Sequence, residues 1–183
     1  MSDVCNKNII TEKIEEFILI ENETSELLGP NKYGQSWSKK EFFYDLKNKW
    51  KYSFYCCRDS KVNGFLITSN YNNKIHAHRL ATKTNLKTRE KLKIIRLLYK
   101  NLEVEAKKNN IESMSAIIPI ANKSIFKFYK QEGWIQLNQE EIEDFITERN
   151  MEAYSRHPSL LIDKYPTHDD PSVSFVLRYF YNY

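Results

Sequence analysis

The chain has 183 residues, of which 41% are hydrophobic and 28% are charged, and its formal net charge is +4. This length suits one domain, and the apolar content excludes a wholly disordered protein. The charge excess is compatible with an anionic ligand, but it is too small to require a nucleic-acid partner.

The three cysteines, Cys5, Cys56 and Cys57, indicate reduced thiols in a cytosolic protein. Cys56 and Cys57 are adjacent, and neighbours on a strand point to opposite faces, so they are poor disulfide partners. None has metal-ligand spacing with a histidine cluster, so we expect no metal. We also see no targeting signal and no apolar run that could span a bilayer, so we expect a cytoplasmic location and no membrane partner.

Two helices and three strands are predicted in the first half of the chain. Thr11 is expected to cap a helix that ends near Leu28, and a segment rich in glycine and proline follows. Ser38 is the expected N-cap of a second helix, "SWSKKEFFYDLKNKW". The strands "YSFYCCR" and "VNGFLITS" flank the tight turn "DSK", and a third strand, "KIHAHRLAT", ends near Thr82.

The second half begins with a long helix from about Thr88 to Asn109, whose apolar residues recur at spacings of three and four. This stripe consists of Leu92, Ile95, Tyr99, Leu102 and Ala106. A strand, "IESMSAIIP", a helix over Asn122–Gln131, a strand, "GWIQL", an acidic helix, "QEEIEDFITERNMEAY", and a final strand, "SVSFVLRYFYNY", follow. Hairpins followed by a strand–helix–strand crossover predict an α/β domain with a mixed sheet.

One segment carries a family resemblance. "NKSIFKFYKQEGW" resembles the N-x-x-A-x-x-F-Y-x-x-x-G-F segment of the GNAT superfamily of acyl-CoA-dependent N-acetyltransferases. Asn122, Tyr129, Gly133 and Trp134 stand at matching positions, and Ser124 lies near the small-residue position. "DSKVNGFL" resembles the turn and strand that precede the family's cofactor strand. "QSWSKKEFFYDL" is similar to the entry segment of the ribosomal-protein alanine acetyltransferase branch. The resemblance covers a little over half of the chain.

The resemblance implies a single GNAT-like domain over residues 1–183, with an insertion at about 139–171 before the last strand. Its fold would be a mixed, mostly antiparallel central sheet with helices on both faces. The implied function is transfer of an acetyl (acyl) group from acetyl-CoA to a primary amine by direct attack in a ternary complex. The alternative is a catalytically inactive GNAT-like domain that binds a CoA derivative or a partner protein.

Two residues are candidates for catalysis. The resemblance implies that the Tyr129 hydroxyl protonates the departing thiolate of CoA, whereas the structural alternative is a core tyrosine with its hydroxyl at the rim. His78, or its neighbour His76, is a candidate base for an ammonium substrate because histidine titrates near neutrality. The structural alternative is a buried, hydrogen-bonded histidine. Strand alternation places both histidines on one face with Leu80 and Thr82.

Cofactor contacts are expected at the end of the same strand. The backbone of Leu80, Ala81 and Thr82 can pair with an extended pantetheine much as it would with a peptide. Asn122 can cap its helix, and the resemblance implies that it also contacts the pantetheine arm.

The family's pyrophosphate loop, R/Q-x-x-G-x-G/A, corresponds here to "KTREKLKII", which has no glycine. The family pattern can be aligned by counting forward from the preceding strand or back from the end of the long helix. The two alignments differ by three residues, so the loop or the helix contains about one extra turn. Either the loop is wider and lysine side chains hold the phosphates, or the site is degenerate. The expected contacts are Lys87, Thr88, Arg89, Glu90, Lys91, Leu92 and Lys93.

The expected partners are acetyl-CoA as co-substrate and an amine acceptor, either a small molecule or a protein amine, with a homodimer as an option. Nucleic-acid binding through the basic helix is disfavoured, because no aromatic platform accompanies it.

Overall fold

The computed structural model describes residues 2–4, 7–28, 36–119, 123–152 and 173–180. Its strands form one seven-stranded sheet in the order β1-β2-β3-β4-β5-β7-β6. The strands are β1 (Ser2–Val4), β2 (Phe54–Arg58), β3 (Lys61–Tyr71), β4 (Lys74–Thr82), β5 (Ser113–Pro119), β6 (Ile135–Gln136) and β7 (Val173–Tyr179). The helices are α1 (Lys7–Leu28), α2 (Lys39–Phe42), α3 (Lys49–Tyr52), α4 (Thr88–Lys108), α5 (Lys123–Gln131) and α6 (Gln139–Glu152).

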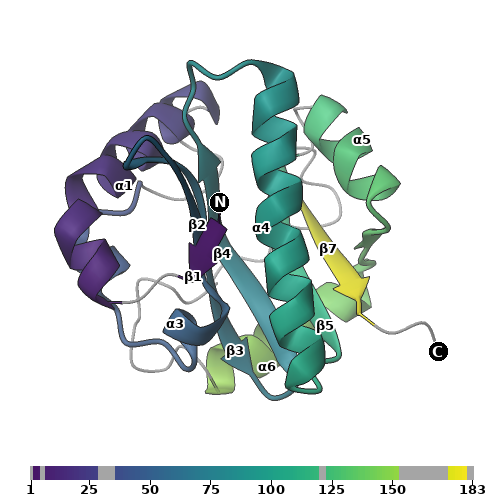
Figure 1. The fold of residues 1–183 in the computed structure, drawn as a ribbon. Helices are drawn as coiled ribbons and strands as arrows, with labels where there is room; N and C mark the ends of the chain where they lie inside the picture. The colour runs from purple at the N-terminus through teal and green to yellow at the C-terminus, as the bar shows by residue number, and fades with distance from the viewer. Residues whose placement is uncertain (1, 5–6, 29–35, 120–122, 153–172, 181–183) are drawn as a thin grey trace.

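Only β4 and β5 pair in parallel, and every other neighbouring pair in this sheet is antiparallel. The expected crossover is therefore β4–α4–β5, with α4 lying across the sheet (Figure 1). The predicted fold class, a mixed and mostly antiparallel sheet flanked by helices on both faces, is confirmed.

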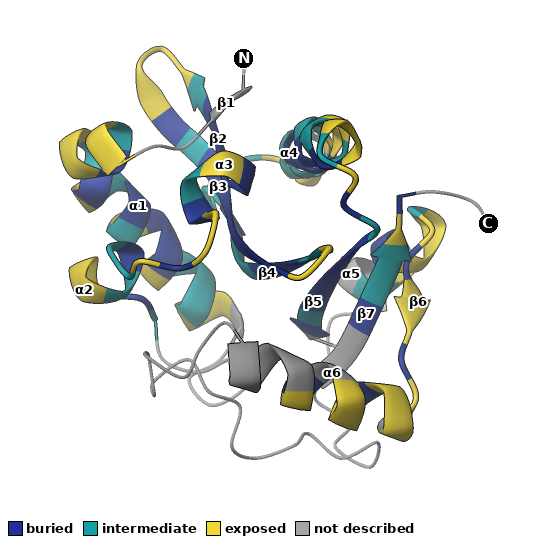
Figure 2. Cartoon of the chain, turned by 90° about the horizontal axis from the view of Figure 1, so that it is seen from below, coloured by how far each residue is buried: buried dark blue, intermediate teal, exposed yellow. Residues whose placement is uncertain are grey.

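Helices lie on both faces of the sheet (Figures 1 and 2), and the apolar clusters beneath them differ in size. On one face, α4 and α5 enclose the largest apolar cluster, which includes Leu66, Leu98, Leu102 and Met114. The predicted stripe of α4 is confirmed there, with Tyr99, Leu102 and Ala106 buried and Leu92 and Ile95 packed against the same cluster.

The opposite face carries two smaller apolar clusters. One lies under α1 and α2 and includes Phe17, Phe42 and Phe65. The other lies under α6, where Ile142 and Ile146 are buried against Tyr71 of β3. The first helix of the expected insertion therefore packs on the domain.

The N-terminal half departs from the predicted helices. Helix α1 begins at Lys7, so the Thr11 cap is wrong: its hydroxyl lies inside the helix and donates to the Lys7 carbonyl at 2.8 Å. The Ser38 cap is confirmed, because the Ser38 hydroxyl accepts from the N–H of Lys40 at 3.2 Å. However, α2 ends at Phe42. Strand β1 was not predicted.

A buried lysine explains why the second helix stops early. Lys49 is 1% exposed, and its ammonium group donates to the Phe42 carbonyl at 2.7 Å. It also donates to the carbonyls of Glu41 and Tyr44 and lies 5.4 Å from the centre of the Trp37 ring. Carbonyl groups that would continue a helix are thus held by a cation from the following segment.

The hairpin of β2 and β3 forms as predicted, but its turn consists of Asp59 and Ser60 alone, because Lys61 of the expected turn begins β3. Asp59 and Ser60 both have positive φ, at 51° and 60°, as in the type I′ turn that suits a two-residue hairpin loop.

Strand β4 contains a bulge that changes the expected faces of its residues. Ile67 pairs with Arg79 and Thr68 with Ala77, so the register of the β3–β4 ladder skips His78. Beyond the bulge the alternation is shifted by one residue. Leu80 packs in the α4 cluster, on the face opposite to His78, so the expectation that the histidines share a face with Leu80 and Thr82 is wrong.

Gly64 allows α4 to approach the sheet closely. A Cβ at this position would lie 2.8 Å from Cγ2 of Ile94 and 3.0 Å from the carbonyl oxygen of Ala81. The missing side chain therefore sets the distance between α4 and the end of β4.

We expect Gly64→Ala to lower the free energy of unfolding by about 1–3 kcal/mol, because a methyl group is forced into a filled contact. Urea denaturation measures this loss. The control is the double variant with Ile94→Ala, which removes the nearest atom, so the two losses should be less than additive. Strict additivity would contradict the proposed contact.

Candidate functional site

Strands β4 and β5 separate before either of them ends. Their ladder runs from Lys74 and Ser113 to Ala77 and Ala116, whereas β4 continues to Thr82. Each strand keeps its other neighbour beyond that point, β3 for β4 and β7 for β5. The separation lies at the carboxyl ends of two parallel strands, where ligands bind in open α/β sheets.

The backbone of Leu80, Ala81 and Thr82 borders this separation. These residues pair with Leu66, Phe65 and Gly64 of β3, and the ladder with β5 does not reach them in the described part of the chain. Their second edge is therefore the predicted place for an extended pantetheine.

Tyr129 lies on the α4–α5 side of the sheet. Its side chain is 5% exposed, and its hydroxyl lies 2.7 Å from the hydroxyl of Tyr99 on α4. The centre of its ring is 6.1 Å from that of Tyr99 and 5.0 Å from that of Trp134. The hydroxyl is thus inside the aromatic cluster, with a partner, and the catalytic role of Tyr129 stays a prediction.

Both tyrosines remain protonated at neutral pH. Burial raises the pKa of Tyr129 to about 12, and the hydrogen bond from Tyr99 acts in the opposite direction. Burial also raises the pKa of Tyr99 well above its ordinary value, and the neighbouring Tyr129 raises it further.

The other face of the sheet carries a row of serines and histidines across three strands. Ser69 pairs with His76 in the β3–β4 ladder, and His76 pairs with Ser115 in the β4–β5 ladder. Nδ1 of His76 lies 3.1 Å from the Ser115 hydroxyl, and Nε2 of the bulged His78 lies 2.9 Å from the Ser69 hydroxyl. The two imidazole rings are 4.9 Å apart.

This row orients imidazoles and does not offer a serine nucleophile. Ser69 and Ser115 are completely buried, as is His76, whereas His78 is only half-buried. Sequence spacing could not reveal these Ser–His pairs, because strand register creates them between residues far apart in the chain.

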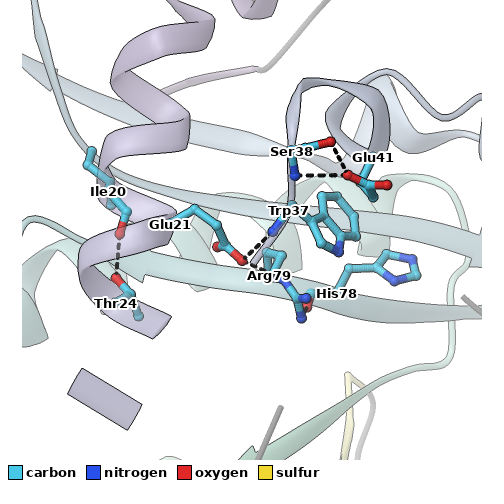
Figure 3. Close-up of polar contacts among 8 residues, drawn as sticks. All are labelled: Ile20, Glu21, Thr24, Trp37, Ser38, Glu41, His78 and Arg79. Carbon is cyan, nitrogen blue, oxygen red and sulfur yellow. Dashed lines mark hydrogen bonds and ion pairs between the residues drawn. The ribbon is translucent and has the colours of Figure 1, made fainter. Parts of the chain in front are cut away.

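An ion pair holds the segment next to the bulge (Figure 3). Nε of Arg79 lies 2.8 Å from a carboxylate oxygen of Glu21 on α1, and the same oxygen accepts from the N–H of Trp37 at 3.2 Å. The guanidinium lies 5.1 Å from the Trp37 ring, which lies 5.8 Å from the ring of His78. Burial lowers the pKa of Arg79, and Glu21 opposes this shift.

The loop 83–87, which leads into α4, is held by carboxylates of this chain. The N–H and hydroxyl of Thr84 donate to Glu23 of α1 at 3.4 and 2.6 Å, and the N–H of Lys87 donates to Glu90 at 3.2 Å. The ammonium of Lys91 donates to the Thr84 carbonyl at 2.7 Å. At least two backbone N–H groups near the predicted phosphate site are therefore already paired.

The other residues that were predicted to contact the cofactor phosphates lie at the start of α4. Lys87, Thr88, Arg89 and Lys93 are exposed, Glu90 and Lys91 are half-buried, and Leu92 packs against the core. Asn122 lies outside the described residues. Within the described ranges, no group of three metal-binding side chains is present, and no helix is long and apolar enough to cross a membrane.

Comparison with solved structures identifies the architecture. The ribosomal-protein-S18-alanine N-acetyltransferase from Escherichia coli matches with a TM-score of 0.65 at 13% identity, over 100% of this chain and 95% of its own. An acetyltransferase of the GNAT family from Staphylococcus aureus Mu50 gives a TM-score of 0.58 at 14% identity, with 99% of both chains covered. The PaiA N-acetyltransferase from Thermoplasma acidophilum, in complex with coenzyme A, gives 0.60 at 15% identity, with 98% of both covered.

No protein-family model matches this sequence, and no curated protein does either. At identities this low, the structural similarity establishes a shared fold alone. The chemistry has to be argued from the residues themselves.

Stability should fall in alkaline solution, because unfolded tyrosine ionises near pH 10 while burial holds the pKa of Tyr129 at about 12. The unfolded chain then loses a proton that the folded chain keeps. The contribution of Tyr129 to the free energy of unfolding is complete below about pH 10. It decreases by about 3 kcal/mol in total as the pH rises toward 12. Denaturation at about pH 8 and about pH 11 should show a smaller decline for Tyr129→Phe than for the unsubstituted chain. Equal declines would contradict the burial effect.

Proposed function

This chain has the fold of the GNAT acetyltransferases, and we propose that it is an acyl-CoA-dependent N-acetyltransferase. It would transfer an acetyl group from acetyl-CoA to a primary amine by direct attack within a ternary complex. The observation that carries the proposal is the separation of β4 and β5, two strands whose opposite faces carry the cluster that includes Tyr129 and the half-buried His78. The coenzyme A complex of the PaiA enzyme supports the choice of cofactor.

The cofactor would lie along the edge of β4 that the ladder with β5 does not reach in the described part of the chain. The pantetheine would pair with the backbone of Leu80 to Thr82, so that the thioester reaches the bulge at His78. A backbone N–H at the separated edge would polarise the thioester carbonyl. The exposed Lys87, Arg89 and Lys93 would attract the phosphates, in place of the backbone nest that glycines provide in the family.

The amine would approach from the face that carries α1, α2 and α6. His78 would take a proton from the ammonium group, and its bond to Ser69 suits this role, because a hydroxyl can donate to or accept from Nε2. The amine nitrogen would then attack the carbonyl carbon, and the carbon–sulfur bond would break. The nitrogen would release its second proton to solvent, and the sulfur would take the Tyr129 proton. Holding both substrates in one site supplies much of the rate.

A second candidate is a GNAT-like domain without catalysis that binds a CoA derivative or a partner protein. The loop 83–87 favours it, because Glu23 and Glu90 occupy N–H groups of Thr84 and Lys87 that a pyrophosphate would need.

We expect Tyr129→Phe to lower turnover at least a hundredfold, because general acid catalysis is worth about 10²–10⁴-fold. Acetyl-CoA affinity, measured by calorimetry, should stay nearly normal because the ring remains. Turnover is followed as release of the CoA thiol with a panel of amines: a peptide N-terminus, a lysine peptide, a polyamine and an amino sugar. The matched control is Tyr179→Phe, at an exposed position on β7, which should keep its rate.

A Tyr129→Phe variant that turns over normally and only melts earlier would make this tyrosine structural. If the unsubstituted chain binds acetyl-CoA and no amine in the panel is acetylated, the second candidate is the better account.

A further inference from the structure

Tyr99 has no assigned role in the proposed reaction, although it is the nearest polar neighbour of the proposed acid. It belongs to the buried stripe of α4, whose other members, Leu92, Ile95, Leu102 and Ala106, carry no polar side-chain atom. Its hydroxyl points across the α4–α5 contact to Tyr129, at 2.7 Å. Both side chains are about 95% buried, within a cluster of apolar residues that also holds Phe128 and Trp134.

Packing alone does not require this pair of hydroxyls. Phenylalanine at both positions would fill nearly the same space, and replacing two partners by apolar groups of the same shape is close to neutral for stability. A single hydroxyl here would be costly, because a buried group without a partner loses its hydration. Each hydroxyl thus serves as the hydrogen-bond partner of the other. Because packing does not require the pair, one of the two hydroxyls is expected to have a function.

The direction of the hydrogen bond follows from the proposed chemistry. If the Tyr129 proton is directed at the sulfur, Tyr129 must accept at its oxygen, and Tyr99 is the donor 2.7 Å away. Burial raises the pKa of Tyr99 well above its ordinary value, so Tyr99 keeps the proton that it would donate. Arg178 acts on Tyr99 in the opposite direction, but burial is the larger effect.

We propose that Tyr99 is a positioning residue for the proposed acetyl transfer. It donates its hydroxyl proton to the oxygen of Tyr129 and so leaves the Tyr129 proton free to turn toward the separation of β4 and β5. When the carbon–sulfur bond breaks, the Tyr129 O–H bond breaks and an S–H bond forms. The remaining oxygen anion is held by the Tyr99 hydrogen bond until a proton from solvent restores it. This inference rests on the proposed function.

The test is Tyr99→Phe in the full chain, assayed with acetyl-CoA and the best acceptor of the amine panel. We expect kcat to fall at least about tenfold, because a hydrogen bond to a charged group is lost. The KM for acetyl-CoA should change by no more than about threefold, as the ring stays in place. Tyr179→Phe again serves as the control.

The double variant Tyr99→Phe/Tyr129→Phe separates positioning from general damage. Because Tyr99 acts through Tyr129, the double variant should be no slower than Tyr129→Phe alone. In protein labelled with ¹³Cζ-tyrosine, the Tyr129 resonance, assigned by its absence in Tyr129→Phe, should shift in Tyr99→Phe.

Three outcomes overturn the inference: an unchanged kcat in Tyr99→Phe, multiplicative losses in the double variant, or an unmoved Tyr129 resonance. Each of these leaves the proposed function standing if the unsubstituted chain turns over. Absence of turnover with every amine in the panel removes the proposed function first, and the role of Tyr99 with it.

Discussion

The early end of the β4–β5 ladder is the constraint on which the candidate site depends. Strand β4 stays paired with β3 to Thr82, and β5 stays paired with β7 to Pro119, so neither strand loses its outer neighbour. The two inner edges diverge after Ala77 and Ala116. Backbone N–H and C=O groups at such edges need partners, and an extended ligand with amide groups can supply them.

The bulge at His78 gives the two faces at this point different chemistry. It shifts the alternation so that His78 and Arg79 both contact partners on the α1–α2 face, while Leu80 packs toward α4. One face therefore offers imidazoles, and the other offers the paired hydroxyls of Tyr99 and Tyr129.

The Glu21–Arg79 ion pair ties α1 to the strand beside the bulge. Glu21 is 3% exposed, so the cost of its desolvation offsets part of the attraction between the two charges. Its second contact, to the Trp37 N–H, fixes the chain next to His78. We interpret the pair as a device that sets the geometry of this face (Figure 3).

Local patterns predicted the parts of the fold that depend on neighbouring residues. The stripe of α4, the Asp59–Ser60 turn and the Ser38 cap all follow from spacing or side-chain chemistry within one element. We did not predict that α1 begins at Lys7 or that Lys49 is buried, because neither feature follows from the spacing of apolar residues within one helix.

The candidate site was only partly predictable for the same reason. Tyr129 could be named from a family resemblance, and His78 and the end of β4 from the chemistry of an imidazole and of a strand edge, but their partners could not. Ser69 meets His78 through strand register, Tyr99 meets Tyr129 through helix packing, and Glu23 reaches the loop from α1. The hydroxyl of Tyr99 within an otherwise nonpolar stripe was the one available signal.

Hydrogen exchange of the β4 and β5 backbones tests the central claim most directly. With acetyl-CoA at a concentration that calorimetry shows to be saturating, exchange should slow in peptides that cover Leu80–Thr82, because the ligand pairs with that edge. Peptides over Ile117–Pro119 should also slow, whereas those over β1 should not change. Saturation without any slowing at Leu80–Thr82 would contradict the placement of the cofactor between these strands.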